Sequence, residues 1–243
     1  MNVVIKNKVE MDQLIAEEIL QLIRRKPNCI LGLATGSSPI GVYQKLIDAY
    51  KNQQISFSQV KSFNLDEYVG LDENHPQSYR YFMNVHLFDQ IDISRENTHV
   101  PSGIGEIEHL AEAYDKQIAA EGGIDLQLLG IGSDGHIAFN EPGTSFSSLT
   151  HIAQLAPSTI SDNSRFFASV EEVPTQAVTM GLKSIMQAKK IILMALGQNK
   201  AQAIYHLLHG PVTEEVPCSI LQRHPDVTIY VDEEAYALCK GEK

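Results

Sequence analysis

Near the N-terminus the chain reads Cys29-Ile-Leu-Gly-Leu-Ala-Thr-Gly-Ser-Ser-Pro39. The first six residues are an apolar run of strand length, and the last five are a turn of small and hydroxylated residues. Beyond Pro39, apolar side chains recur every three to four positions, which is the period of an amphipathic helix. A buried strand that passes through a glycine turn into a helix is the building unit of a parallel sheet.

The same alternation of strand and helix continues along the chain. Further strands are predicted at Val60–Phe63, Asp125–Ile131, Lys190–Leu196 and Val227–Val231. Amphipathic helices are predicted from Met11, from Ile107 and from Lys200. This order predicts an α/β fold with three layers, a mostly parallel sheet covered by helices on both faces, similar to a Rossmann fold. No linker or repeat interrupts the pattern, so residues 1–243 are expected to form a single domain.

Composition excludes several classes of function. The formal net charge is -11, which opposes binding to nucleic acid and to anionic membranes. No apolar run reaches the ~18 residues that a membrane-spanning helix needs. The three cysteines, Cys29, Cys218 and Cys239, are odd in number and lack CxxC spacing. We therefore expect a cytoplasmic protein without a disulfide framework or a zinc site.

Ligands of open parallel sheets bind beyond the carboxyl ends of the strands. Thr35, Gly36, Ser37 and Ser38 follow the first such strand, and a turn of this kind at a helix start can bind phosphate through its N–H groups and hydroxyls. It can equally be an ordinary turn with a capping serine. Arg165 and Lys200 are candidate partners for an anion, and Lys200 follows a second strand and glycine turn. Taken singly, both cations are more simply explained as surface residues.

The segment Gly130-Ile-Gly-Ser-Asp-Gly135 has the form G-x-G-x-x-G, but no long helix follows it, which disfavours a dinucleotide cofactor. It is followed by chemically useful residues instead. Asp134, His136 and Glu141 lie within eight positions of one another, and a histidine oriented by carboxylates can move protons near neutral pH. A surface turn with solvated acids is the plain alternative. A metal site is a weaker one, because this spacing is not a known ligand pattern.

Asp66 and Glu67 follow the strand Val60–Phe63. If both residues are extended, their side chains point in opposite directions, so that one enters the cleft and the other leaves it. A carboxylate in the cleft could act as a general base on a carbon acid. A helix cap or a solvated loop explains the pair about as well.

Together these segments resemble the glucosamine-6-phosphate deaminase (isomerase) family over nearly the whole chain. Four blocks carry the resemblance, in the family's order. They are Leu31-Gly-Leu-Ala-Thr-Gly-Ser-Ser-Pro39, Phe63-Asn-Leu-Asp-Glu-Tyr-Val-Gly-Leu71, Gly130-Ile-Gly-Ser-Asp-Gly-His-Ile-Ala-Phe-Asn-Glu-Pro142 and Asn163-Ser-Arg-Phe-Phe167. The resemblance implies the deaminase/isomerase type of α/β fold. It also implies a hydrolase that converts glucosamine 6-phosphate to fructose 6-phosphate and ammonia in amino-sugar catabolism.

The resemblance also implies a role for each candidate residue. Asp66 looks like the general base that moves a proton from C2 to C1. His136 looks like the acid/base that opens the sugar ring, with Asp134 and Glu141 as its partners. The phosphate is expected at Thr35, Gly36, Ser37, Ser38, Arg165 and Lys200. No metal and no cofactor are implied, because positioned acids and bases suffice for this chemistry.

Two other functions remain open. The 6-phosphogluconolactonases share the phosphate loop and an Asp-Gly-His turn, but they usually carry Arg where Tyr68 stands and a Ser-Leu-Phe-Pro-like run after the histidine. A non-catalytic sugar-phosphate sensor would not need the full acid/base set. The only expected partner is a small-molecule sugar phosphate, and the chain is expected to be a monomer or a small homo-oligomer. Residues 148–154 lack the basic side chains that allosteric members of the family place there, so no activation by an acetylated sugar phosphate is expected.

Overall fold

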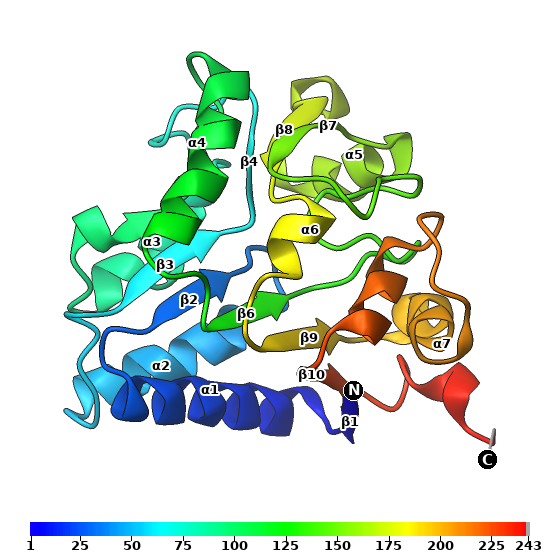
Figure 1. Ribbon diagram of the computed structural model, residues 1–243, viewed down its shortest axis with the longest axis horizontal. Coiled ribbons are helices and arrows are strands. Elements are labelled where there is room, and N and C mark those ends of the chain that lie inside the picture. The colour runs from blue at the N-terminus through cyan, green and yellow to red at the C-terminus, as the bar shows by residue number, and fades with distance from the viewer. Residues whose placement is uncertain (242–243) are drawn as a thin grey trace.

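The computed structural model describes residues 1–241, except for the side chain of Phe166. Within these residues a parallel sheet of seven strands forms the centre of the molecule (Figure 1). Its strands follow the order β1-β10-β9-β6-β2-β3-β5, and each neighbouring pair is parallel. They are β1 (Asn2–Ile5), β2 (Ile30–Leu33), β3 (Lys61–Asn64), β5 (Thr98–His99), β6 (Leu126–Leu129), β9 (Ile191–Ala195) and β10 (Val227–Val231).

Helices cover both faces of this sheet, as the alternation of strands and helices predicts. On one face lie α1 (Lys8–Arg25) and α2 (Ile40–Lys51), and on the other lie α4 (Ile107–Ala120), α6 (Leu182–Ile185) and α7 (Ala201–His209) (Figure 1). Successive strand residues supply the two cores: Leu128 packs with the first group and Leu129 with the second. No helix within residues 1–241 has both the length and the apolar character needed to cross a membrane.

A smaller antiparallel sheet lies beside α5 (Pro157–Asn163), in the upper part of Figure 1. It contains β4 (Asp66–Tyr68), β8 (Gln176–Thr179) and β7 (His151–Gln154), in that order. Sequence periodicity did not predict this sheet, and Asp66 and Glu67 prove to be strand residues rather than loop residues. The register pairs Asp66 with Thr179, so the position of Asp66 depends on a segment far along the chain.

The order of the strands creates a crevice at the centre of the main sheet. From β2 the chain proceeds to β3 and β5 on one side, and it then continues through β6, β9 and β10 on the other. The connections that follow β2 and β6 therefore lead away from each other. Such a switch point is where open α/β sheets bind their ligands.

Candidate active site

A cavity of about 870 Å³ opens at this crevice. Segments from both sheets and from α5 contribute to its wall, and most of the residues predicted from the sequence line it. These are Thr35, Gly36, Ser37, Ser38, Asp66, His136, Arg165 and Lys200. Asp134 and Glu141 lie behind His136 rather than on the wall. The fold thus brings the predicted acid/base residues and the predicted phosphate-binding residues together at one cavity.

The turn between β2 and α2 has the features of an anion site. Gly36 adopts φ +86°, a left-handed conformation that suits glycine. No side chain caps α2, so the capping-serine alternative is wrong. Among the hydrogen bonds within residues 1–241, none is donated by the backbone N–H groups of Gly36, Ser37 or Ser38. Those groups lie at the positive end of α2, where an anion is favoured.

The two predicted cations reach the same cavity from different elements. Lys200 ends a short 3-10 turn, Gln198–Lys200, that follows β9, and Gly197 before it has the same φ of +86° as Gly36. Arg165 lies in the 3-10 turn after α5. Burial lowers the pKa of Lys200, and nearby Asp162 and Asp134 partly oppose this effect. Both cations therefore line the same cavity as the turn 35–38.

His136 is held between two carboxylates. Its Nδ1 lies 2.8 Å from Oδ1 of Asp134 and 3.5 Å from Oε2 of Glu141. A Cβ on Gly132 would lie 2.3 Å from the imidazole ring, so a glycine is needed to make room for it. Burial raises the pKa of Asp134, but the hydrogen bonds and charge of His136 outweigh it and bring that pKa to about 2. Asp134 is therefore ionised and can orient the ring near neutral pH.

Glu141 is fixed on its other side by α5 and the residue before it. Its Oε1 accepts hydrogen bonds from Thr159 Oγ1 at 2.7 Å and from Ala156 N at 3.2 Å. Its Oε2 is buried and has no hydrogen-bond partner within the described part of the chain. The group is thus a built arrangement rather than a turn with solvated acids. Ligand atoms of Asp134, His136 and Glu141 lie within 4.8 Å of one another, so they could also hold a metal ion.

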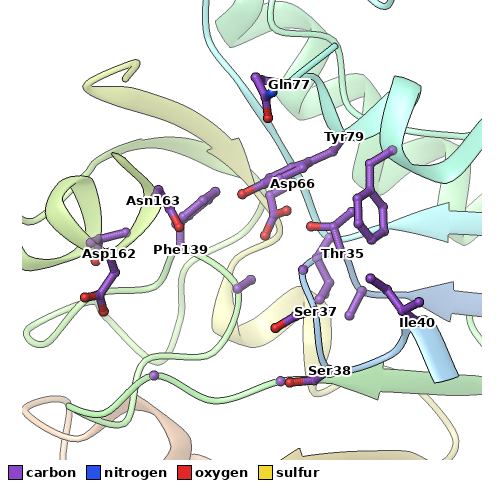
Figure 2. A pocket seen from close by; sticks show the side chains of 18 of the residues that line it. Thr35, Ser37, Ser38, Ile40, Asp66, Gln77, Tyr79, Phe139, Asp162 and Asn163 are labelled. Carbon is purple, nitrogen blue, oxygen red and sulfur yellow. The ribbon is translucent and has the colours of Figure 1, made fainter. Parts of the chain in front are cut away.

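Asp66 projects into the cavity near Thr35 and Tyr79 (Figure 2). The residue is only 6% exposed. Burial, and then the negative charge of Glu67, raise the pKa of Asp66 from 3.8 to about 8. A carboxylate with a pKa close to neutral is suited to accept a proton from carbon and to return it.

Glu67 points away from the cavity and serves the structure. Its Oε1 accepts from the backbone N–H groups of Tyr68 and Tyr79, both at 2.9 Å, and its Oε2 accepts from that of Arg80 at 3.0 Å. The last two bonds bind Glu67 to the start of α3 (Tyr79–His86). The opposite orientation of the two acids agrees with the sequence prediction, and Asp66 is the one that enters the cleft.

Sequence reasoning missed the cavity wall formed by α3. Tyr79 and Phe82 of this helix line the cavity. Phe139 and Asn163 from other segments line it as well, and Figure 2 shows both together with Tyr79. Ser78 caps α3 by accepting from Tyr81 N at 3.1 Å. A serine followed by aromatic residues at helical spacing was the available signal for this element.

Comparison with known proteins identifies the family to which this chain belongs. Residues 8–230 match the model of the family described as glucosamine-6-phosphate isomerases/6-phosphogluconolactonase. The chain belongs to this family. Family members similar to it include a glucosamine-6-phosphate deaminase of Thermoanaerobacter pseudethanolicus, 52% identical over 97% of this chain and 94% of the relative. One of Mycoplasma mycoides is 54% identical over 96% of this chain and 95% of the relative.

Solved structures of the family give the same fold. A monomeric glucosamine-6-phosphate deaminase superposes with a TM-score of 0.96 at 40% identity, over 98% of this chain and all of that chain. A 6-phosphogluconolactonase from Trypanosoma brucei has a TM-score of 0.79 at 20% identity, over 98% of each chain. The second likeness shows the shared fold alone.

Proposed function

We propose that this chain is a glucosamine-6-phosphate deaminase, which converts glucosamine 6-phosphate and water to fructose 6-phosphate and ammonia. One observation carries the proposal: Asp66 and the His136 group face the same cavity as the turn 35–38 and the two cations. Full-length relatives named as glucosamine-6-phosphate deaminases, at about 50% identity, support this substrate.

The phosphate of the substrate binds at the start of α2. The N–H groups and hydroxyls of Thr35–Ser38 surround it, and Arg165 and Lys200 supply positive charge. This placement is supported by the unpartnered N–H groups of the turn and by the position of both cations on the cavity wall. Because the whole protein carries a net charge of -11, an anionic substrate needs such local compensation.

His136 opens the sugar ring. It removes the proton from O1 and delivers one to O5, which breaks the C1–O5 bond and leaves an aldehyde at C1. Its Nδ1 has a carboxylate on either side, Asp134 at 2.8 Å and Glu141 at 3.5 Å. The two neighbours stabilise the imidazolium that forms between the two proton transfers.

Asp66 then moves the proton that makes the reaction an isomerisation. It takes the proton from C2, giving an enolamine, and returns it to C1, giving an imine at C2. Water adds to this imine and ammonia leaves, so C2 becomes the ketone of fructose 6-phosphate. The net reaction consumes water, which supports its description as a hydrolase although isomerisation comes first. The aldehyde at C1 accepts the electron pair that remains when C2 loses its proton, and the amine at C2 then forms the imine. The proposed reaction therefore requires no cofactor and no metal.

The proposed activity is accompanied by proposals for the domain organisation, the oligomeric state and the cellular location. We take residues 1–243 as one domain that acts as a monomer in the cytoplasm and binds only its sugar phosphate. The monomeric state is supported by the solved deaminase of TM-score 0.96. The reducing compartment is supported by Cys29 and Cys218, which are buried and form no disulfide within the described residues. A lactonase function has weaker support, because the lactonase structures share only the fold with this chain.

Incubation with glucosamine 6-phosphate in the presence of EDTA tests the proposal. We expect ammonia and fructose 6-phosphate in equal amounts. Activity that EDTA abolishes and a divalent ion restores would instead assign Asp134, His136 and Glu141 to a metal. Release of 6-phosphogluconate from its lactone, without ammonia from the amino sugar, would identify a lactonase. Binding of the sugar phosphate without any product would indicate a sensor.

A further inference from the structure

A half-buried ion pair beside the turn 35–38 is not explained by the proposed reaction. Lys8, the first residue of α1, contacts both carboxylate oxygens of Asp12, with Nζ 2.5 Å from Oδ1 and 2.7 Å from Oδ2. The same Nζ donates to the carbonyl oxygen of Ser38 at 3.0 Å. Lys8 lines the cavity, and Asp12 is only 6% exposed. The three donors of the ammonium group therefore have fixed partners, one of which belongs to the phosphate turn.

Gly41 shows that this pair is built into the packing of α1 against α2. A Cβ at Gly41 would lie 2.0 Å from Oδ2 of Asp12 and 3.0 Å from Nζ of Lys8. Glycine inside a helix costs about 1 kcal/mol relative to alanine, and Gly41 has no left-handed φ that would require it. Its reason is space. In the first turn of α2, a glycine of low helix propensity leaves space for the Asp12 carboxylate.

The charges of Lys8 and Asp12 affect anion binding because the pair lies against the turn 35–38. A buried Asp12 without its partner would put an uncompensated negative charge next to the turn that binds phosphate. Lys8 neutralises it and also holds the Ser38 carbonyl from the side of α1. The N–H groups of Gly36, Ser37 and Ser38 donate to no partner within residues 1–241, so their orientation depends on such external support.

We propose that Lys8 and Asp12 are positioning residues that set the affinity of the turn 35–38 for the phosphate group. The inference rests on the proposed function for its substrate, but it concerns phosphate binding alone. Lys8 acts through Ser38 and through Asp12, and it takes no part in ring opening or in proton transfer between carbons.

Lys8→Met tests this role, with Lys6→Met as a matched control. Lys6 pairs with Glu10 at 3.2 Å, also four residues apart, and its side chain is 42% exposed against 38% for Lys8. The control removes the same charge from the same end of the molecule, but Lys6 does not line the cavity. For Lys8→Met we expect KM for glucosamine 6-phosphate to rise about tenfold with kcat within about twofold. Lys6→Met should match the wild type in both, and Lys8→Arg should recover part of the affinity.

Binding measurements keep the test independent of turnover. In calorimetry with inorganic phosphate and with fructose 6-phosphate, Lys8→Met should bind each about tenfold more weakly than Lys6→Met. Gly41→Ala should weaken binding to a similar extent, because its methyl group displaces the Asp12 carboxylate. This variant replaces Lys8→Met in the test if Lys8→Met does not fold. Equal affinities in Lys8→Met and Lys6→Met, a fall in kcat without a rise in KM, or no binding of either compound to the wild type would overturn the inference. If the binding differences are found as expected but the wild type has no deaminase activity, the proposed reaction is refuted and the role of Lys8 and Asp12 in phosphate binding is not.

Discussion

Asp66 and Glu67 are neighbours in β4, yet their carboxylates point to opposite sides of the strand. Asp66 enters the cavity, whereas Glu67 accepts three backbone N–H groups and holds the start of α3. The buried charge of Glu67 also contributes to raising the pKa of Asp66 to about 8. One pair of residues thus links the shape of the cavity wall to the proton affinity of the proposed base.

This link predicts the pH dependence of the reaction. The base must be ionised to accept a proton, so kcat/KM should rise with pH and level off above about 8, the pKa of Asp66. Glu67→Gln removes a negative neighbour, which should move the midpoint to lower pH. The hydroxyls of Tyr68, Tyr79 and Tyr114, which also interact with Asp66, have raised pKa values and stay neutral in this range.

The control for this profile is Glu112→Gln, which alters a 71% exposed carboxylate on α4. Its midpoint should stay at the wild-type value. A Glu67→Gln enzyme that loses activity without any shift of the midpoint would show that Glu67 acts only through the position of α3.

Asp66→Asn should stabilise the folded protein at alkaline pH. The pKa of Asp66 is raised from 3.8 to about 8 on folding, so between these values the folded state binds more protons than the unfolded state. Stability therefore falls as pH rises through this window, and the amide abolishes that loss. Thermal unfolding should give a higher Tm for the variant at pH 8, and the difference should vanish below about pH 4. A lower Tm at pH 8 would contradict the assignment.

The main sheet follows from local patterns, whereas β4 does not. The buried runs of β2, β9 and β10 and the amphipathic faces of α1 and α7 are strong periodic signals. β4 has three residues, Asp-Glu-Tyr, and its pairing with β8 joins segments more than a hundred positions apart. No local pattern predicts such a partner. The helix α3, which Glu67 holds in place, was not predicted either, although Ser78 and the aromatic residues after it were a local signal for it.

The site was predicted as a set of residues but not as an arrangement. Asp66, His136 and Lys200 each follow a strand of the sheet, and parallel strands bring their carboxyl ends together. The sequence could not show that Glu141 is fixed by Thr159, or that Asp66 becomes buried beside Glu67. Those facts depend on the small sheet and on α5, which only the three-dimensional structure supplies.

Arg165→Ala and Lys200→Ala should weaken substrate binding more than they impair catalysis. Each removes a charge-assisted contact to phosphate, worth ~1.5–3 kcal/mol, so KM should rise more than kcat falls. Steady-state kinetics measure both constants, with Lys116→Ala on the exposed face of α4 as the control. Unphosphorylated glucosamine should be a very poor substrate for the wild type. If glucosamine is turned over nearly as well, the phosphate assignment is wrong.

The rate should depend hyperbolically on glucosamine 6-phosphate, without activation by N-acetylglucosamine 6-phosphate. Residues 148–154, which include β7, carry no Lys or Arg that could bind a second phosphate. Allostery requires a second site and two states that the effector distinguishes. Initial rates with and without the acetylated compound, together with light scattering, check this expectation. A sigmoidal curve that the compound makes hyperbolic, or a stable hexamer, would disprove it.

Exchange of the C2 proton of glucosamine 6-phosphate tests the role of Asp66 most directly. In D2O, proton NMR should show the wild-type enzyme replacing this proton with deuterium as fructose 6-phosphate accumulates. Asp66→Asn keeps the shape of the side chain but cannot accept a proton, so exchange and turnover should both fall by ~10²–10⁴ or more, while phosphate binding persists. Exchange at the wild-type rate in Asp66→Asn would show that another group is the base.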